Sequence, residues 1–299
     1  MKRILGILFL LLLVQPVLPH YKARYHVIVD TDGGIDDFRA ICMMLASPEI
    51  EIMAITAVDG ILSPEETAAR LSSLLKHFGH EGIPLGMGKS VAGKSRMPEK
   101  AAMASYTQWV KAESPALSLS LPDAAGLIMK SIELEEMPVD IIALGPLTNL
   151  EAFLQESGGI PERVRKVYWY NDAESKLDFN YVFDAASAGV ILKSGFSIDR
   201  VNGAGKRLEN LDGFLAGLDT ATTPYACAVR ELYTDPPPGF MNHIMATLIA
   251  DDCIPVYMLY PEQFTVSTCG EQPKHRIAYA SKEAVMAPLI LDTGQRPGG

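Results

Sequence analysis

The chain has 299 residues and a formal net charge of −10 at pH 7. This acidic balance, with no basic patch along the chain, argues against a nucleic-acid-binding protein, because such proteins depend on lysine and arginine contacts with phosphates. The four cysteines lack the spacing of a metal site. We expect at most one disulfide, formed among Cys227, Cys253 and Cys269.

The first 20 residues are typical of a secretory signal peptide, although the sequence leaves the cleavage site open. Two basic residues precede an uncharged apolar run over residues 4–14, and two prolines follow it. Such a run is too short to span a bilayer, and an uncleaved anchor extending to Leu18 is the alternative. We therefore expect a secreted or periplasmic protein with no stable membrane partner after cleavage. Residues 21–299 are expected to form a single domain, because no repeat or linker interrupts them.

Apolar, β-branched runs alternate with segments of helical periodicity along the rest of the chain. Strands are expected at 27–29, 51–57, 83–87, 139–144, 164–170, 196–201 and 276–280. Helices are expected from 36 onward and at 63–78, 122–136, 147–156, 184–193, 205–216, 222–233, 240–250 and 281–291, with a short one at 101–111 inside a long excursion. Ser63, Pro64 and Glu66 form a helix-capping signature. The alternation predicts an α/β fold: a doubly wound, mainly parallel sheet with helices on both faces.

Four carboxylates follow the first expected strand within eight residues: Asp30, Asp32, Asp36 and Asp37. Their mutual repulsion is offset in part by the helix N-terminus, and a hard divalent cation would offset more, because Ca²⁺ and Mg²⁺ prefer carboxylate oxygens. The alternative is that one pair caps the helix and the other is solvated, but capping needs only one or two of the four. The sequence therefore predicts a metal site at this turn.

Polar residues from later segments are expected to meet these carboxylates, because ligands of such sheets bind outside the carboxyl ends of the strands. The candidates are residues 145–149 after the fourth strand, Asp178 and Asn180 after the fifth, and Asp251 at the end of a late helix. Convergence from segments this far apart favours a ligand site.

Residues 30–37, Asp-Thr-Asp-Gly-Gly-Ile-Asp-Asp, resemble the signature of the inosine-uridine-preferring nucleoside hydrolases, with Gly33 in place of a proline. Residues 143–150 are similar to the central motif of that family, residues 54–56 to its second strand, and residues 178–180 to its acidic-Phe-Asn segment. The resemblance implies a hydrolase acting on the N-glycosyl bond of a nucleoside or a related riboside, with this family's fold.

The resemblance also implies a calcium site and a catalytic base. Ca²⁺ would be held by Asp32, Asp37, the backbone carbonyl of Leu144, and Asp251, and Asp36 would be the general base acting on a Ca²⁺-bound water. The metal would position the sugar and make its water easier to deprotonate.

Three further roles follow from the same resemblance. Asp178 and Asn180 would bind the sugar, and Asp30 would orient the loop without touching the metal. Cleavage of an N-glycosyl bond passes through an oxocarbenium-like sugar, which anionic surroundings stabilise.

Four departures from the family pattern concern the substrate side of the site. Ile61 stands where the family has an asparagine that contacts the ribose, and Ala250 stands where many members have a histidine that assists the leaving base. Asp178 replaces the usual glutamate, and residues 168–171, Tyr-Trp-Tyr-Asn, replace a glycine-rich stretch. The metal half of the site is therefore expected to be intact, and the sugar-and-base half to be altered.

Two other functions remain as alternatives. One is a non-catalytic protein that binds Ca²⁺ and sugar on the same fold. The other, a Mg²⁺-dependent phosphatase resembling the haloacid dehalogenases, is disfavoured because Gly34 replaces an expected Thr or Val and because Asp36 and Asp37 would be unexplained. The oligomeric state is left open, with a homo-oligomer among the alternatives.

Some further signals are interpreted as unrelated to function. Residues 88–95 satisfy the P-loop pattern, but Pro98 opposes the helix that a P-loop requires. Trp169 and Tyr170 are interpreted as core side chains, and His243 as a packed or exposed one rather than a proton donor.

Overall fold

The computed structural model describes most of the chain, in several ranges. They are residues 23–94, 120–172, 178–203, 216, 218–220, 223–231, 250–269 and 272–280. The expected signal peptide, His243 and all or nearly all of the helices expected at 101–111, 205–216, 240–250 and 281–291 lie outside them. Within these ranges, no helix has both the length and the apolar character needed to cross a membrane.

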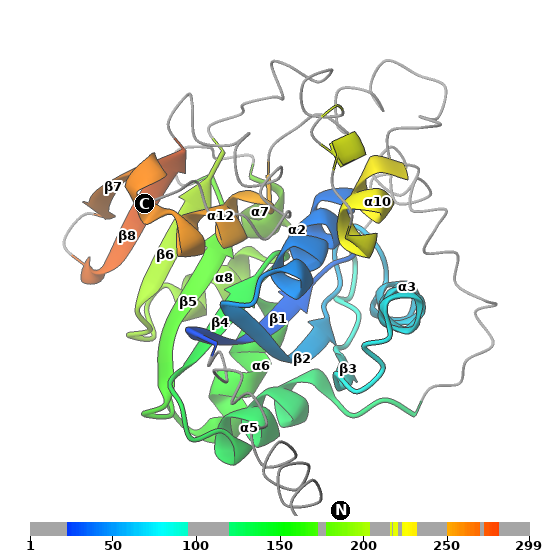
Figure 1. The fold of residues 1–299 in the computed structure, drawn as a ribbon. Coiled ribbons are helices and arrows are strands. Elements are labelled where there is room, and N and C mark those ends of the chain that lie inside the picture. The colour runs from blue at the N-terminus through cyan, green and yellow to red at the C-terminus, as the bar shows by residue number, and fades with distance from the viewer. Residues whose placement is uncertain are drawn as a thin grey trace, which may run out of the picture.

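An eight-stranded sheet forms the centre of the molecule, in the order β3-β2-β1-β4-β5-β6-β8-β7 (Figure 1). The strands are β1 (Tyr25–Thr31), β2 (Ile50–Ala57), β3 (Leu85–Met87), β4 (Val139–Ala143), β5 (Val164–Tyr170), β6 (Ile198–Asn202), β7 (Phe264–Cys269) and β8 (Gln272–Ala280). Every neighbouring pair is parallel except β7 and β8, which are antiparallel. The predicted doubly wound, mainly parallel α/β fold is confirmed.

Helices cover both faces of the sheet. They are α2 (Ile35–Ala46), α3 (Pro64–Phe78), α5 (Ala124–Leu134), α6 (Thr148–Ser157), α7 (Phe179–Phe183), α8 (Ala185–Ile191), α10 (Pro224–Glu231), α12 (Cys253–Leu259) and a 3₁₀ turn, η2 (Pro261–Gln263). Residues of α2, α3, α10 and α12 pack into one apolar cluster with the sheet, and residues of α5, α6 and α8 into another. The molecule is therefore a three-layer α/β/α arrangement (Figure 1).

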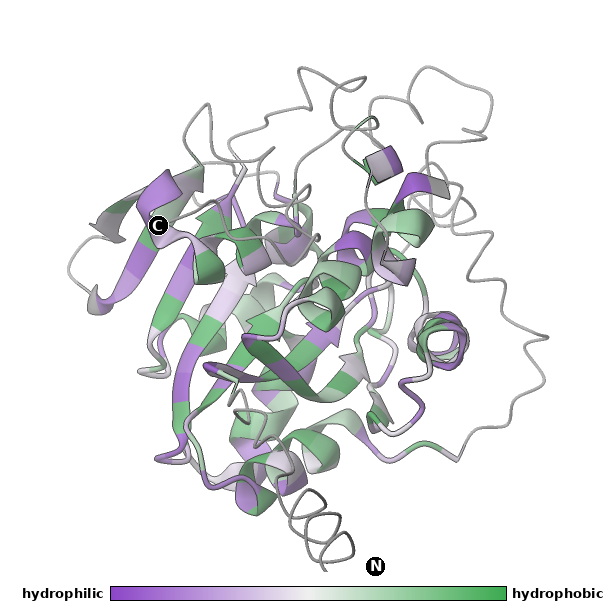
Figure 2. Ribbon diagram, in the orientation of Figure 1, coloured by the Kyte–Doolittle hydropathy of each residue, from purple (hydrophilic) through white to green (hydrophobic). Residues whose placement is uncertain are grey.

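The two apolar clusters arise from the alternation of side chains along each strand. Val27 and Val29 of β1 belong to the α2 side, whereas Ile28 between them belongs to the α6 side. In the same way, Ile142 and Ile141 of β4 face opposite layers. Strands buried on both faces need continuous apolar runs, and Figure 2 shows hydrophobic residues making up much of the central strands. This is why the sequence signals for β1 and β4 were strong.

The capping signature before α3 is present as predicted. Ser63 Oγ accepts a hydrogen bond from Glu66 N at 3.1 Å, and Glu66 Oε2 accepts one from Ser63 N at 3.3 Å. Gly79, with φ of +72°, ends the helix in the left-handed conformation that favours glycine. The expected bounds of this helix are confirmed.

Besides the 3₁₀ turn η2, two α-helices and one strand were not predicted: α7, α12 and β7. Each is five to seven residues long, too short to show a distinct hydrophobic period. One of them changes the expected surroundings of Asp251, which lies in a turn leading into α12.

Cys42, Cys227 and Cys253 carry reduced thiols.

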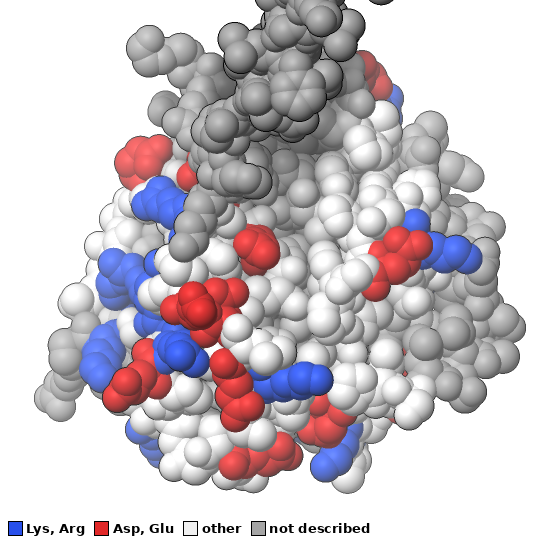
Figure 3. Space-filling view, turned by 60° about the horizontal axis from the view of Figure 1, so that its bottom comes forward, with Lys and Arg blue, Asp and Glu red and all other residues white. Residues whose placement is uncertain are grey.

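Charged side chains are intermingled on the face of the molecule shown in Figure 3, where acidic and basic groups lie next to one another. Charged side chains are also paired between neighbouring strands of the sheet. Asp140 of β4, whose side chain is fully buried, accepts from Arg165 of β5 at 2.9 Å, and buried Asp199 of β6 accepts from Lys166 at 2.8 Å and from Arg276 at 2.8 Å. Each of these two buried carboxylates is therefore matched by a cation.

Candidate active site

The order of the strands reverses direction at β1. Beginning from β1, the chain adds β2 and β3 on one side and β4, β5 and β6 on the other. In open α/β sheets this switch point leaves a crevice at the carboxyl ends of the strands, where ligands bind. The ends of β1 and β4 are joined there, because Leu144 N donates to the carbonyl of Asp30 at 2.8 Å.

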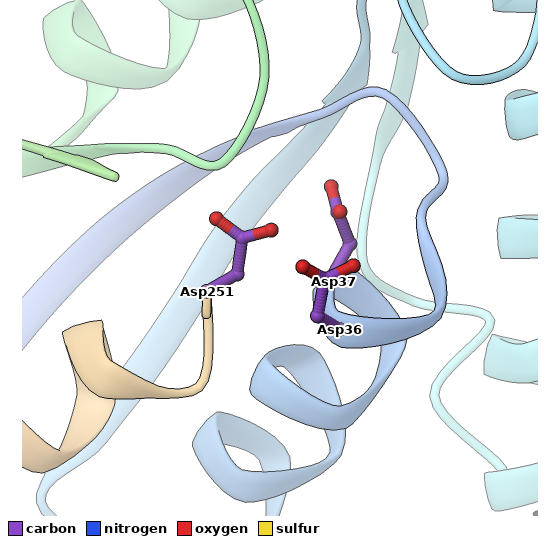
Figure 4. A group of neighbouring side chains, drawn as sticks. All are labelled: Asp36, Asp37 and Asp251. Carbon is purple, nitrogen blue, oxygen red and sulfur yellow. The ribbon is translucent and has the colours of Figure 1, made fainter. Parts of the chain in front are cut away.

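Three carboxylates meet at this crevice. One oxygen each from Asp36, Asp37 and Asp251 lies within 4.8 Å of the others. Asp36 and Asp37 stand on the first turn of α2, and Asp251 faces them from the turn before α12 (Figure 4). Among the described residues, this is the one group of acidic, histidine or cysteine side chains with a spacing that could hold a metal ion.

No lysine or arginine ion pair to these three carboxylates is present among the described residues. Burial raises the pKa of Asp37 to about 7, with the Asp36 charge adding to the rise, and burial together with the Asp37 and Asp36 charges raises the pKa of Asp251 well above its usual range. Asp37 Oδ2 and Asp251 Oδ1 are buried with no hydrogen-bond partner among the described residues. Buried oxygen ligands of this kind suit a divalent cation, which would supply the missing partner. The cluster therefore fits a metal ion.

Asp32 lies against the cluster but is not one of its three members. Its backbone N donates to Asp37 Oδ1 at 3.2 Å, and its Oδ2 accepts from Ile61 N at 3.2 Å. Its side chain fits between two glycines: a Cβ on Gly60 would lie 2.6 Å from Asp32 Cβ, and one on Gly145 would lie 2.9 Å from the same atom. The backbone must approach Asp32 closely at both positions, which only glycine allows.

Asp30 lies below the cluster, within the sheet. Its Oδ1 accepts from Thr56 Oγ1 at 2.6 Å and from Asn149 Nδ2 at 2.8 Å. Burial raises the pKa of Asp30 to about 7 despite these two hydrogen bonds. Asp30 thus joins β1 to β2 and to the start of α6.

Leu144 and Asn180 are in direct contact. Asn180 Nδ2 donates to the Leu144 carbonyl at 2.7 Å and to the Tyr170 carbonyl at 3.1 Å. This amide therefore holds together the ends of β4 and β5. The Leu144 carbonyl keeps a second lone pair, since a carbonyl oxygen has two.

Asp178 caps α7. Its Oδ1 accepts from Tyr181 N at 2.9 Å and from Asn171 Nδ2 at 2.6 Å, and its Oδ2 accepts from Asp172 N at 2.9 Å. Arg200 on β6 in turn donates from Nε to Asn171 Oδ1 at 2.8 Å. Sequence reasoning missed this arginine, because a single cation within a strand carries no motif.

The two aromatic residues at the end of β5 differ in their surroundings. Trp169 is fully buried and donates to the Gly145 carbonyl at 3.1 Å, so its interpretation as a core residue is confirmed. Tyr170 is half-buried against the core. Burial raises the pKa of Tyr170, and the nearby Cys253 and Asp251 raise it further. Its phenol therefore stays protonated beside the acidic cluster.

Two further side chains near the cluster were not expected. Thr31 Oγ1 donates a short hydrogen bond to Asp37 Oδ1. Arg39 on α2 forms a buried ion pair with Asp252, at 3.4 Å. Thr31 lies inside the 30–37 motif but was given no role there, and Arg39 belongs to no motif that the sequence made visible.

Comparisons with known proteins show which family this chain resembles over most of its length. The family model "Inosine-uridine preferring nucleoside hydrolase" matches residues 27–274. A non-specific ribonucleoside hydrolase of Escherichia coli is 29% identical over 275 residues, covering 82% of this chain and 83% of its own length. A pyrimidine-specific ribonucleoside hydrolase of a Shewanella species is 23% identical over 259 residues, with 81% and 80% covered.

Solved structures share the fold. A plant nucleoside hydrolase superposes with a TM-score of 0.70 at 21% identity, covering 91% of this chain and 100% of its own. A purine-preferring ribonucleoside hydrolase from Gardnerella vaginalis gives a TM-score of 0.68 at 17% identity, covering 90% and 98%. With the family model matching most of the chain, the protein belongs to the inosine-uridine-preferring nucleoside hydrolase family, whose members hydrolyse N-glycosyl bonds.

Proposed function

We propose that this protein is an exported, Ca²⁺-dependent hydrolase that cleaves a nucleoside or a related riboside into sugar and base. The main support for this proposal is that Asp36, Asp37 and Asp251 converge at the switch point of the sheet. Some of their buried oxygens have no hydrogen-bond partner among the described residues. The family assignment also removes the reason for considering a phosphatase.

Four groups would hold the Ca²⁺ ion: the side chains of Asp32, Asp37 and Asp251 and the carbonyl of Leu144. All are oxygen ligands, which Ca²⁺ prefers, and the three side chains are buried. When bound, Ca²⁺ would make a water molecule easier to deprotonate and would orient the sugar.

Asp36 is the proposed general base. It is half-buried, whereas Asp37 and Asp251 are buried, so it is the cluster carboxylate that an attacking water and a substrate can reach. Asp36 takes a proton from that water as the water attacks the anomeric carbon. The neighbouring carboxylates favour the positive charge that develops on the sugar ring, because opposite charges in a site shielded from water attract strongly.

The sugar side of the proposed site contains Asp178 and Asn180. Their contacts with Asn171 and with the Leu144 carbonyl fix both side chains before a substrate arrives. Fixed polar groups lose little entropy when they bind a ligand. These two residues would therefore select the sugar rather than the base.

The leaving base has no positioned acid at residue 250, which is a buried alanine. Loss of a positioned acid costs about 10²–10⁴ in rate, and the cost is larger for poor leaving groups. Since curated relatives and solved structures of this family are named non-specific, pyrimidine-specific or purine-preferring, membership does not determine the base. We propose selectivity for substrates with good leaving groups.

A second candidate function is a non-catalytic protein that binds Ca²⁺ and sugar. Ile61 and Ala250 favour it, because neither side chain can supply the polar contact expected at its position. Asp36 opposes it, because its half-buried carboxylate lies beside Asp37 and Asp251 where an attacking water and a substrate can reach it.

Calorimetry on the metal-free protein tests the calcium site. Wild type is expected to bind one Ca²⁺ ion, and Asp37→Ala to bind none, because Asp37 supplies a buried ligand. Asp219→Ala, in an exposed ion pair with Arg230, is the matched control and should bind like wild type. Unchanged binding by Asp37→Ala would show that the ion binds elsewhere.

Turnover separates the enzyme from the binding protein. With Ca²⁺ present, wild type should hydrolyse p-nitrophenyl riboside faster than inosine, because p-nitrophenol leaves without acid assistance. Asp36→Asn should lower that rate by about 10²–10⁴ and leave most of the Ca²⁺ affinity in place. Equal, slow release of p-nitrophenol by wild type and by Asp36→Asn would favour the binding protein.

A further inference from the structure

A buried ion pair joins the two chain segments that supply the acidic cluster. Arg39 Nη2 lies 3.4 Å from Asp252 Oδ1, and the two side chains are 1% and 2% exposed. The partners are 213 residues apart in sequence. Arg39 follows Asp36 by three positions on α2, and Asp252 directly follows Asp251. Each end of the pair is therefore tied to one half of the cluster.

Asp252 also fixes the turn that presents Asp251. Its Oδ1 accepts from Ala250 N at 2.8 Å, and Cys253 N donates to the Ala250 carbonyl at 2.9 Å. Asp251 lies between Ala250 and Asp252, and the backbone N of Ala250 is hydrogen-bonded to the side chain of Asp252. The position of the Asp251 carboxylate relative to α2 therefore depends on where Arg39 holds Asp252.

Arg39 is an unusual residue for its place in the fold. Its neighbours on α2 are Phe38, Ala40 and Ile41, all fully buried, so an apolar side chain would suit this part of the helix. Burying a guanidinium and a carboxylate removes both from water, which is unfavourable. The attraction between the two charges often does no more than offset this desolvation free energy. A gain in global stability is thus a poor reason for such a pair.

We propose that Arg39 and Asp252 are positioning residues: their ion pair holds Asp251 against Asp36 and Asp37 in the arrangement that binds Ca²⁺. The inference rests on the proposed function, since it concerns the same metal site. Groups that orient metal ligands without touching the metal typically contribute about 10–100-fold to metal affinity. The i and i+3 positions of Asp36 and Arg39 also lie on one side of α2, so a shift of Arg39 would be transmitted to the base.

The decisive variant is Arg39→Met/Asp252→Asn, studied by calorimetry with CaCl₂ on the metal-free mature chain. It replaces one positive and one negative side chain by two neutral ones of similar size, so the net charge near the cluster does not change. Any loss of affinity then comes from lost positioning. We expect Ca²⁺ to bind about 10–100-fold more weakly than to wild type.

Arg165→Met/Asp140→Asn is the matched control. It removes another ion pair whose carboxylate is fully buried, between β4 and β5 and away from the strand ends that carry the cluster. This control should lower the unfolding temperature and leave the Ca²⁺ affinity at the wild-type value. A general loss of stability would weaken Ca²⁺ binding in both double variants, which would overturn the inference.

Single variants separate position from charge. Arg39→Met removes a positive charge near the cation site, so electrostatics alone predicts tighter Ca²⁺ binding, whereas the positioning role predicts weaker binding. Arg39→Lys keeps the charge without the planar fork of donors and should show an affinity between those of wild type and the double variant. If the double variant does not fold, weaker binding by Arg39→Lys supports the inference and wild-type binding overturns it.

The results for the inference and for the proposed function can be told apart. Ca²⁺ binding of equal affinity in wild type and in a folded double variant overturns the positioning role alone. Absence of Ca²⁺ binding by wild type overturns the proposed function and the inference with it.

Discussion

Buried carboxyl groups make the stability of the metal-free protein depend on pH. The pKa of Asp30 is raised from 3.8 to about 7, so the folded state binds this proton more tightly than the unfolded chain does. The resulting stabilisation is fully present below about pH 4 and is lost as the pH rises to about 7. Asp30 alone lowers the free energy of unfolding by on the order of 4 kcal/mol over this pH range. Each unit of difference between the folded and unfolded pKa values corresponds to about 1.4 kcal/mol.

We therefore expect the metal-free protein to unfold at a lower urea concentration at about pH 8 than at about pH 5. Asp30→Asn should flatten this dependence, because an amide stays neutral and its oxygen can still accept from Thr56 and Asn149. Urea titrations at several pH values measure both proteins. An Asp30→Asn protein with the wild-type slope would assign the pH dependence to other groups, such as Asp37.

Individual residues were predictable where a motif or a strand end marked them. Asp36 and Asp37 follow a strong apolar strand, and Asp251 was a candidate at the end of an expected late helix, to which the family resemblance added a metal-binding role. The structure brings these three together. The contact between Asn180 and the Leu144 carbonyl was not foreseen, nor was the pairing of Arg39 with Asp252. A lone arginine in a helical pattern looks like any exposed helix residue, and its partner 213 positions away is set only by the tertiary fold.

At the level of elements, the loop after β2 determines how closely the backbone approaches Asp32. A methyl group on Gly60 would lie 2.6 Å from Asp32 Cβ, a distance that real Cβ atoms do not show. Gly60→Ala should therefore displace Asp32 and lower both Ca²⁺ affinity and turnover by at least about tenfold, as expected when support of a metal ligand is disturbed. Calorimetry and p-nitrophenyl riboside hydrolysis measure the two effects.

Gly126→Ala provides the control for that substitution. Gly126 lies within α5, and a Cβ there would meet nothing within 4 Å. Alanine in a helix interior is more favourable than glycine by about 0.5–1 kcal/mol, so this variant should be slightly more stable with wild-type Ca²⁺ affinity. A Gly60→Ala protein that behaves like Gly126→Ala would mean that the Asp32 side chain does not take part in the site.

Elements with long periodic signals were predicted nearly to their bounds. Helix α3 was found through its capping residues, and the bounds of β5, 164–170, match those expected. The short α7 and α12 were missed, because their starts depend on Asp178 and on the turn at Asp252 rather than on an apolar period. The positions of α7 and α12 therefore depend on residues at the site, and local sequence patterns do not reveal such contacts.

At the scale of the whole molecule, the position of β1 limits where a signal peptide can be cleaved. All seven residues of Tyr25–Thr31 are buried, and Tyr25 Oη donates to the Met258 carbonyl at 2.7 Å. Cleavage before Tyr25 leaves the central strand complete, whereas cleavage after it would remove part of the sheet. We expect the full chain, produced in a secreting bacterium, to be exported and to begin between about residue 20 and residue 25.

Mass spectrometry of the exported protein determines its first residue. Replacing apolar residues of the 4–14 run by charged ones should keep the protein in the cytoplasm, because an interrupted apolar run no longer acts as a signal. Recovery of the wild-type chain in the cytoplasm with its first residues intact would contradict export.

The separation of the two halves of the acidic cluster along the chain affects how fast the protein folds and unfolds. Asp37 lies on α2, directly after β1, whereas Asp251 comes from a turn that follows β4, β5 and β6 along the chain. Parallel pairings between distant strands form slowly, so the complete set of carboxylates exists only late in folding. A bound ion that stabilises only the finished structure leaves the refolding rate unchanged and slows unfolding. Calcium would then give the native state kinetic stability: each folded molecule would last longer, although it would not fold faster.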